Sequence, residues 1–292
     1  MIDFLKYRYV CMASSIALLV VGIAAYAIKG GFQYHIDFVG GTELRITFDK
    51  QLPISQLRSA LSEKGWQDPV IQSVGINEQD FLVRVASMSG EGVEEKFTKD
   101  MSEAIPDNKL TIKTIDWVGA EVGKDITWNA FQAVFYSMLI LLLYIAMRYR
   151  FKYAVGAVAA LAHDVFMVLI IFLLLGEQIS VNVLGALLAI LGYSLNDTIV
   201  IYSRIRENVD KIKGMTEAEI VNLSINQTLS RTLLTSFATL LAVMSVFLLG
   251  GESLRGFSLA MLIGIVFGTY SSIYIASPIM LAVSGSSKEN RA

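Results

Sequence analysis

Six stretches of the sequence are long and apolar enough to cross the roughly 30 Å hydrocarbon layer of a membrane as helices. These stretches cover residues 9–28, 126–147, 153–175, 181–203, 231–249 and 257–282. Only 17% of the residues are charged, whereas a soluble domain carries roughly 25%. The sequence therefore predicts an α-helical polytopic membrane protein with six transmembrane helices.

The first stretch has the charge pattern of a signal peptide, because Lys6 and Arg8 precede it. Its apolar part is longer than the roughly 7–15 residues usual in a signal peptide. We therefore interpret this stretch as an uncleaved anchor.

The short loops between the helices predict an orientation, because cytosolic loops are rich in Lys and Arg. Basic residues gather before the first helix, at 148–152, at 204–213 and at 288–291, whereas the opposite loops hold Glu177, Glu252 and Arg255. We therefore expect cytosolic termini and four parts. These are a cytosolic N-terminus with the first helix (1–28), a periplasmic domain (29–125), a five-helix bundle with a cytosolic loop at 204–230 (126–283), and a cytosolic tail (284–292).

The external domain carries strand and helix patterns in the order βαββαβ. The strands are expected at 41–48, 69–75, 81–86 and 110–113, with helices at 54–61 and 93–104 and a polar turn at Asn77–Asp80. This order is that of the split βαβ, or ferredoxin-like, α+β motif. Because the domain holds no plausible catalytic cluster, we interpret it as a binding or lever domain.

A glycine pair joins the first membrane helix to the first strand. Gly40 and Gly41 permit a turn with positive φ, Asp37 is placed to cap it, and Thr42 follows. Two interpretations stay open for these four residues: a hinge that aims the domain, or a motif that contacts a translocating substrate.

No cofactor site is evident in the sequence. The stretch GAEVGKD (Gly119–Asp125) resembles a phosphate-binding loop, but it has one residue too few between its glycines and Asp125 where Ser or Thr is needed. The single cysteine and two distant histidines provide neither a disulfide framework nor a metal cluster. We expect no ATP hydrolysis, no other catalysis and no cofactor, with protons as the coupling ion.

Asn196 and Asp197 lie side by side inside the fourth apolar stretch. A carboxylate at the centre of a membrane helix costs about 2.5–3.5 kcal/mol on insertion scales, and such residues are functional candidates by default. At 1.5 Å per residue, Asp197 lies roughly 10 Å inside the cytosolic boundary. A second polar stripe lies on the fifth helix and comprises Thr228, Arg231, Thr232, Thr235 and Thr239.

Arg231 is long enough to reach Asp197 if the two stripes face each other. Burial favours the neutral form of a carboxyl group, whereas a nearby guanidinium favours the ionised form. Asp197 is therefore a candidate proton carrier, and Arg231 is its fixed counter-charge because arginine stays protonated. Two alternatives stay open: Arg231 extends to the cytosolic interface, or Asp197 is a structural hydrogen-bond partner of the threonine stripe.

Two further features lie in the third and sixth helices. His163 and Asp164 lie near the middle of the third helix, where they form either a second proton relay or a satisfied packing contact. The sixth helix carries Gly264 and Gly268, a spacing typical of close helix packing. We expect Thr235 and Thr239 on the fifth helix to contribute to helix packing as well.

Four motifs resemble one family. They are IDFVGGT (Ile36–Thr42), GYSLNDTIVIYSRIREN (Gly192–Asn208), TLSRTLLTS (Thr228–Ser236) and GTYSSIYIASP (Gly268–Pro278). Together with the helix layout, they resemble the SecF members of the SecD/SecF protein-export family, within the resistance-nodulation-division (RND) superfamily. Two residues depart from the family pattern: His35 stands where a glycine is usual, and Ser203 where an aspartate is common.

The resemblance implies a subunit of the bacterial inner membrane that uses the proton-motive force to assist late steps of Sec-dependent protein translocation. It implies SecD as the other half of a pseudo-symmetric assembly, association with the SecYEG channel, and YajC and YidC as further candidate partners. The family's essential acid and arginine match Asp197 and Arg231. An unfolded polypeptide would be the substrate, and no nucleic acid is expected.

Two other functions are compatible with parts of the sequence. One is an RND-type half-transporter that exports a small apolar molecule, although a single small external domain disfavours it. The other is an intramembrane aspartyl protease using Asp164 and Asp197, which requires both carboxyls to share one site and lacks the usual G-x-G-D motif.

Overall fold

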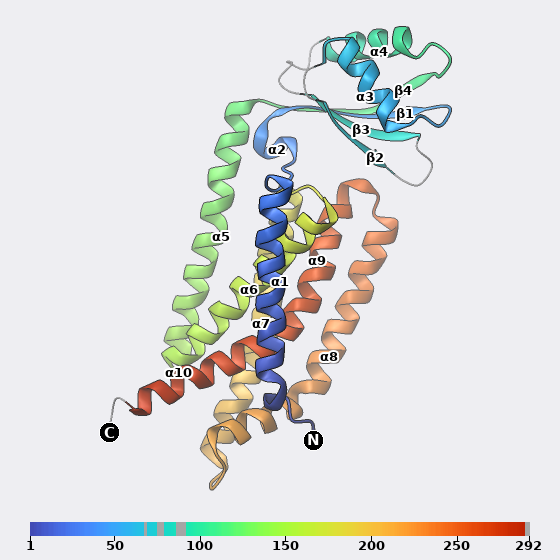
Figure 1. Cartoon of the computed structure of the whole chain (residues 1–292). Helices are drawn as coiled ribbons and strands as arrows, with labels where there is room; N and C mark the ends of the chain where they lie inside the picture. Colours follow the sequence, from blue (N-terminus) through green and yellow to red (C-terminus); the bar gives the residue numbers. More distant parts are fainter. Residues whose placement is uncertain (67–68, 75–78, 86–91, 290–292) are drawn as a thin grey trace. The chain divides into compact units, whose positions relative to one another are not determined.

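The computed structural model describes residues 1–66, 69–74, 79–85 and 92–289. The chain separates into two compact units (Figure 1). Unit 1 comprises Met1–Gln33 and Phe131–Ala292, and unit 2 comprises Tyr34–Ala130. The first two residues of the predicted turn Asn77–Asp80 and the basic residue Arg291 lie outside the described residues.

Six helices of the described chain are long and apolar enough to cross a membrane, which confirms the predicted number. They are α1 (Arg8–Lys29, after the 3-10 turn η1, Leu5–Tyr7), α5 (Ala120–Arg148), α6 (Phe151–Leu175), α7 (Val181–Lys211), α8 (Glu217–Leu249), and a sixth built from α9 (Glu252–Ser271), the π-helical turn η2 (Ser272–Ala276) and α10 (Ser277–Glu289). The stretch that resembles a phosphate-binding loop lies mostly within the first turns of α5.

The connection expected at 204–230 is itself largely helical. Helix α7 continues to Lys211 and α8 begins at Glu217. A capping box starts α8: Glu219 N donates to Thr216 Oγ1 at 3.3 Å and Thr216 N donates to Glu219 Oε2 at 2.7 Å. This box satisfies two backbone N–H groups that the helix leaves unpaired, so the helix begins well before the apolar stretch.

Two small residues let α9 approach α7 closely. A Cβ atom added to Gly264 would lie 2.2 Å from Ile190 Cδ1, and one added to Gly268 would lie 3.0 Å from Ser194 Cβ. Helices without a hydrophobic drive between them associate through such close packing. The two glycines therefore bring the polar residues of α7 and α9 together in the centre of the bundle.

Lys29 at the end of α1 attaches that helix to α6. Its Nζ donates to the carbonyls of Leu173 at 2.8 Å and Leu174 at 3.0 Å. These carbonyls belong to the last turn of α6. Carbonyl groups there lack N–H donors from a following turn, and the helix dipole stabilises a positive charge at that end. The contact fixes the ends of two neighbouring helices to each other.

Unit 2 contains a four-stranded sheet with two longer helices and one short helix. Its elements are α2 (Ile36–Val39), β1 (Gly41–Phe48), α3 (Ile54–Glu63), β2 (Val70–Val74), β3 (Asp80–Val85), α4 (Val93–Ala104) and β4 (Leu110–Val118). The strand order is β2-β3-β1-β4 with antiparallel neighbours throughout. This topology confirms the predicted βαββαβ arrangement.

The core of unit 2 follows from the alternation in β1. Leu44, Ile46 and Phe48 are buried, and Leu44 lies opposite Val83 and Ile115 in the neighbouring strands. Side chains of a strand point alternately to opposite faces, so one face of the sheet receives the buried residues of α3 and α4.

Candidate functional site

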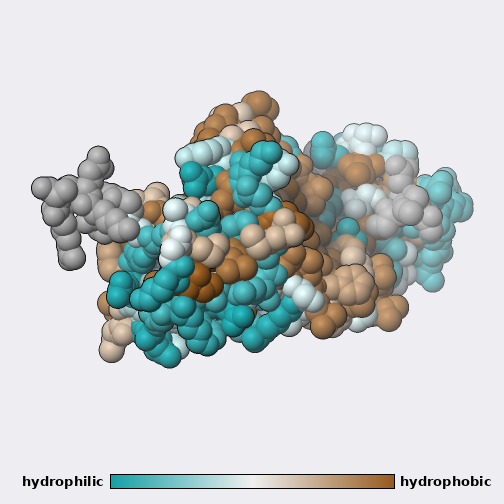
Figure 2. All heavy atoms as spheres, turned by 90° about the horizontal axis from the view of Figure 1, so that it is seen from below, coloured by the Kyte–Doolittle hydropathy of each residue, from teal (hydrophilic) through white to brown (hydrophobic). Residues whose placement is uncertain are grey.

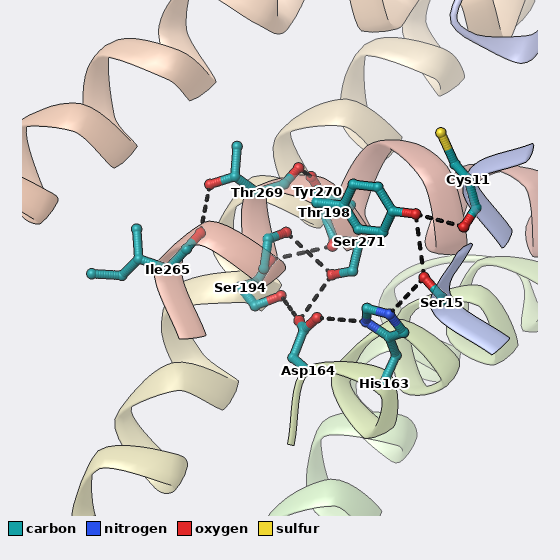
Figure 3. Close-up of polar contacts among 12 residues, drawn as sticks. Cys11, Ser15, His163, Asp164, Ser194, Thr198, Ile265, Thr269, Tyr270 and Ser271 are labelled. Carbon is teal, nitrogen blue, oxygen red and sulfur yellow. Dashed lines mark hydrogen bonds and ion pairs between the residues drawn. The ribbon is translucent and has the colours of Figure 1, made fainter. Parts of the chain in front are cut away.

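Asp164 on α6 is the hub of a buried hydrogen-bond network in the membrane-spanning bundle (Figure 3). Its side chain is 0% exposed. Asp164 Oδ2 accepts hydrogen bonds from Ser194 Oγ on α7 at 2.6 Å and from Ser271 Oγ on α9 at 2.9 Å. Asp164 Oδ1 lies 3.1 Å from His163 Nδ1. Three helices thus meet at one carboxylate that is fully supplied with donors.

His163 continues this network to α1. His163 Nε2 lies 3.0 Å from Ser15 Oγ, and Ser15 Oγ lies 3.2 Å from the hydroxyl of Tyr270. Tyr270 donates in turn to the carbonyl of Cys11 at 2.7 Å. Figure 3 shows these groups as an unbroken chain between Asp164 and α1. Groups that are satisfied in this way rigidify a structure.

The sequence did not identify Ser15, Ser194, Ser271 and Tyr270 as members of the network around Asp164 and His163. The only signal was their polarity within apolar stretches, because hydroxyl groups often hydrogen-bond across membrane helices. Periodicity gives the face of a helix on which such a group lies, but not the helix that meets that face.

Asp197 on α7 is buried as well, at 3% exposed, but its environment differs from that of Asp164. The only hydrogen bond to its carboxylate among the described residues comes from Ser236 Oγ on α8, at 3.5 Å. Such a length is at the outer limit for a hydrogen bond. Ser236 makes a shorter contact of 2.7 Å with Thr269 Oγ1 on α9. Asp197 is therefore a buried carboxyl group that is weakly satisfied.

Two buried hydroxyl groups in the same region also lack partners within the described part of the chain. They belong to Tyr193, one helical turn before Asp197 on α7, and to Thr232, one turn before Ser236 on α8. Residues four apart share one face of a helix. Unsatisfied buried polar groups are rare and call for an explanation, and here they gather around the predicted proton carrier.

The predicted pairing of Arg231 with Asp197 is not formed in this conformation. Arg231 is exposed, and no ion pair within 4.0 Å joins these two described residues, although Arg231 remains within electrostatic reach. The reason is the rotation of α8. Its buried face carries Thr228, Thr232 and Ser236, so Arg231 lies about 100° away from Thr232, on the outer side.

Thr235 shares the outer side of α8 with Arg231, and its hydroxyl group donates to the carbonyls of Arg231 and Thr232, each at 3.0 Å. Thr239 donates to the Thr235 carbonyl at 2.9 Å. Both hydroxyl groups are therefore satisfied by carbonyls of their own helix. Asn196 on α7 is likewise exposed. Polar residues therefore lie on the outer surface of a membrane-spanning bundle.

The two buried aspartates have different hydrogen-bond partners. Asp164 is held by Ser194, Ser271 and His163, whereas Asp197 contacts Ser236. None of these four partners is common to both carboxyl groups.

The glycine turn in unit 2 is built differently from the sequence-based expectation. His35, rather than Asp37, occupies the N-cap position of α2. Gly40 and Gly41 have positive φ angles of 73° and 126°, and a Cβ atom on Gly41 would lie 2.9 Å from the Val85 carbonyl oxygen. Thr42 is fully buried in β1. A side chain at position 41 is therefore excluded both by conformation and by space.

His35 lies between two carboxylates. Its Nδ1 is 3.0 Å from Asp37 Oδ1 and its Nε2 is 3.1 Å from Glu43 Oε1. Burial is the largest single influence on the pKa of His35, and it lowers that pKa. The hydrogen bonds and charges of Asp37 and Glu43 together outweigh burial and raise the pKa to about 9. The protonated ring therefore bridges α2 and β1 at neutral pH.

This bridge predicts a pH dependence of stability. Since the pKa of His35 is raised above its unfolded value near 6.5, its stabilisation is fully present below about pH 6.5 and is lost as the pH rises through 9. The protonated ring adds at most about 3 kcal/mol to the free energy of unfolding. Solvent screening makes the real contribution smaller, because the ring is partly exposed. All three tryptophans lie in unit 2, so tryptophan fluorescence during denaturation of the full chain in detergent reports its unfolding. The loss of stability between pH 6.5 and 9.5 should be smaller in His35→Gln, and an equal loss in both proteins would contradict the bridge.

Comparisons with known proteins agree with this architecture. The sequence model of the family described as "Protein export membrane protein SecD/SecF, C-terminal" matches residues 97–286. Protein translocase subunit SecF of Escherichia coli O157:H7 is 39% identical over 283 residues, which cover 96% of this chain and 87% of that protein. Protein translocase subunit SecDF of Thermus thermophilus is 39% identical over 284 residues, covering 94% of this chain but 37% of that longer protein.

Solved structures give the same result for the fold. A crystal structure of SecDF from Thermus thermophilus, described as a translocon-associated membrane protein, superposes with a TM-score of 0.88 at 37% identity and covers 97% of this chain. A SecDF structure in a super-membrane-facing form gives a TM-score of 0.70 at 34% identity over 99% of this chain. The chain spans 39% and 40% of these two structures. From its helix layout, its sheet topology and these matches, the chain belongs to the SecD/SecF family of protein-export membrane proteins, as a SecF-type translocase subunit.

Proposed function

We propose that this chain couples the proton-motive force to late steps of protein translocation across a bacterial inner membrane, with Asp197 as the group that binds and releases the proton. The contrast between its two buried carboxylates supports this role. Asp164 is stabilised by three donors, whereas Asp197 has one hydrogen bond of 3.5 Å. Carboxyl groups whose environments differ in this way take different roles, and the weakly satisfied one is the better proton carrier.

SecD is the partner that this function requires. Relatives named SecDF carry both halves in one chain, of which the present chain covers 37% in the Thermus thermophilus protein. The exposed polar residues Asn196 and Arg231 support a protein partner here, because polar side chains in membrane spans almost always face protein or water. The SecYEG channel, YajC and YidC are further partners implied by the family.

The proposed cycle starts from the open arrangement of Asp197 and Arg231. Loss of a proton makes Asp197 negative and favours a closer approach of Arg231, and protonation releases it. The loops rich in Lys and Arg favour a cytosolic position of both termini, which supports a periplasmic position of unit 2. The chain enters unit 2 after α1 and leaves it through α5. Movements of these two helices would therefore be transmitted to unit 2, which would hold an emerging polypeptide.

Membrane vesicles provide the test of this function. Inverted vesicles with and without this chain, both containing SecD and SecYEG, would import a preprotein whose early translocation is driven by ATP. We expect an imposed proton gradient to increase the amount of protease-protected, full-length preprotein only when this chain is present, and a protonophore to remove the difference. Gradient-driven efflux of an apolar dye without any effect on the preprotein would instead support export of small molecules.

A further inference from the structure

A small pocket of about 260 Å³ lies where α5 and α7 reach the arginine-rich end of the bundle. Its lining comprises Arg148, Tyr149, Ser203, Arg206, Glu207 and Asp210. We propose that this pocket binds the phosphodiester headgroup of an anionic phospholipid of the phosphatidylglycerol type. The proposal rests on the membrane spans and the pocket, and is independent of the transport function proposed above.

Arg148 and Arg206 in the lining are available to bind an anion. Glu207 is occupied by Arg204 and Lys211, each at 2.7 Å. Arg148 and Arg206 make no ion pair within 4.0 Å with any residue that the structure describes. The guanidinium of Arg148 lies 5.4 Å from the centre of the Tyr149 ring. Arginine suits phosphate because its planar group donates two parallel hydrogen bonds.

The hydroxyl groups of the lining are well placed beside these arginines. Ser203 Oγ lies 2.8 Å from the hydroxyl of Tyr149, so the end of α5 and the exposed side of α7 are joined at the pocket. The serine hydroxyl is uncharged, so position 203 adds no negative charge to this lining. The pocket of this chain is thereby suited to an anion.

The position of the pocket favours a lipid over a free anion. Tyr144 and Ile140 lie four and eight residues before Arg148 on the same face of α5, and they are 53% and 63% exposed. This apolar face leads along the membrane span to the arginine. Figure 2 shows the end of the molecule seen from below, where hydrophilic side chains lie beside hydrophobic ones. An amphiphile can therefore place its phosphate in the pocket and its acyl chains along α5.

Asp210 selects among phospholipids. It lies one to two turns beyond Ser203, away from the apolar span, where the outer part of a headgroup would lie. When Arg204 and Lys211 on Glu207 are counted with the lining, four cations face the carboxylates of Glu207 and Asp210, and this positive excess favours an anionic phosphodiester. The hydroxyl groups of a glycerol headgroup can donate to Asp210. Phosphatidylcholine offers no such donor, and zwitterionic phosphatidylethanolamine would leave the positive charge uncompensated.

Lipid titration of the full chain in an uncharged detergent tests the proposal. Native mass spectrometry would count bound phosphatidylglycerol, phosphatidylethanolamine and phosphatidylcholine for the wild type and for Arg148→Gln, Arg206→Gln and Ser203→Asp. We expect phosphatidylglycerol to bind most tightly and each arginine variant to weaken it roughly five-fold. Ser203→Asp should weaken it similarly while keeping the contact with Tyr149, since a carboxylate accepts from that hydroxyl group.

A matched control is Arg255→Gln, because Arg255 lies at the other end of the bundle beside Glu177 and should not affect binding. Competition by inorganic phosphate as strong as that by the lipid would overturn the lipid assignment. Equal binding of phosphatidylglycerol by the wild type and all three pocket variants would overturn the site. A preference for phosphatidylethanolamine that is lost in Asp210→Asn would overturn the proposed headgroup.

Discussion

Replacing Asp197 by Asn should reduce gradient-driven translocation to the level measured without a gradient, whereas Glu should retain part of it. An amide cannot exchange a proton under these conditions, while a glutamate keeps the carboxyl group on a side chain that is longer by one methylene. Because the one hydrogen bond to Asp197 among the described residues is the long contact with Ser236, the Asn variant should lose little packing. The measurement is protease-protected preprotein in vesicles with and without a proton gradient.

Two controls separate coupling from assembly. Variant complexes should first be shown to retain SecD, since an unassembled subunit would also be inactive. Asp3→Asn is a matched change of an exposed carboxyl group outside the membrane spans, and Asn can still accept from Lys6 N, so this control should leave gradient-driven translocation unchanged. If Asp197→Asn behaves as the wild type in an intact complex, then Asp197 is a packing residue and the proton path must use Asp164 or the partner.

Gly156→Ala should destabilise the helical bundle by about 4 kcal/mol. A Cβ atom at Gly156 would lie 2.4 Å from the Tyr202 hydroxyl and 2.5 Å from the Ala276 carbonyl oxygen, and Tyr202 donates to that oxygen at 3.0 Å. Overpacking of a core costs about 1–3 kcal/mol, and breaking a buried hydrogen bond adds about 1–3 kcal/mol. The neighbouring atoms include backbone, so they cannot rotate away.

The thermal midpoint can be followed through Cys11, which is the single cysteine of the chain. A thiol-reactive fluorophore would label it as the detergent-solubilised bundle unfolds. Gly185→Ala is the matched control, because no neighbouring atom of the described residues lies within 4 Å of a Cβ atom at that position. Alanine favours helix over glycine by about 1 kcal/mol, so this control should melt at or above the wild-type temperature. Equal midpoints for both variants would contradict the packing argument.

The membrane spans and the βαββαβ order could be predicted because each is encoded in a local pattern. The partners of the buried carboxylates could not. Ser236, rather than Arg231, contacts Asp197, although both belong to one polar stretch of α8. The choice between them depends on the rotation of a whole helix, which is set by its packing. The bridge formed by His35 also requires Glu43, eight residues away on another element.

The π-helical turn η2 changes the neighbours of the sixth span halfway along its length. Before the turn, α9 packs on α7, α8 and α6, whereas after it α10 packs mainly on α6, and Figure 1 shows the change of direction between them. A π turn adds one residue to a helix, which rotates every later side chain by about 100°. One continuous span therefore provides Ser271 to Asp164 and, five residues later, a carbonyl to Tyr202. The turn gives a single helix two inward faces, each fitted to a different part of the bundle.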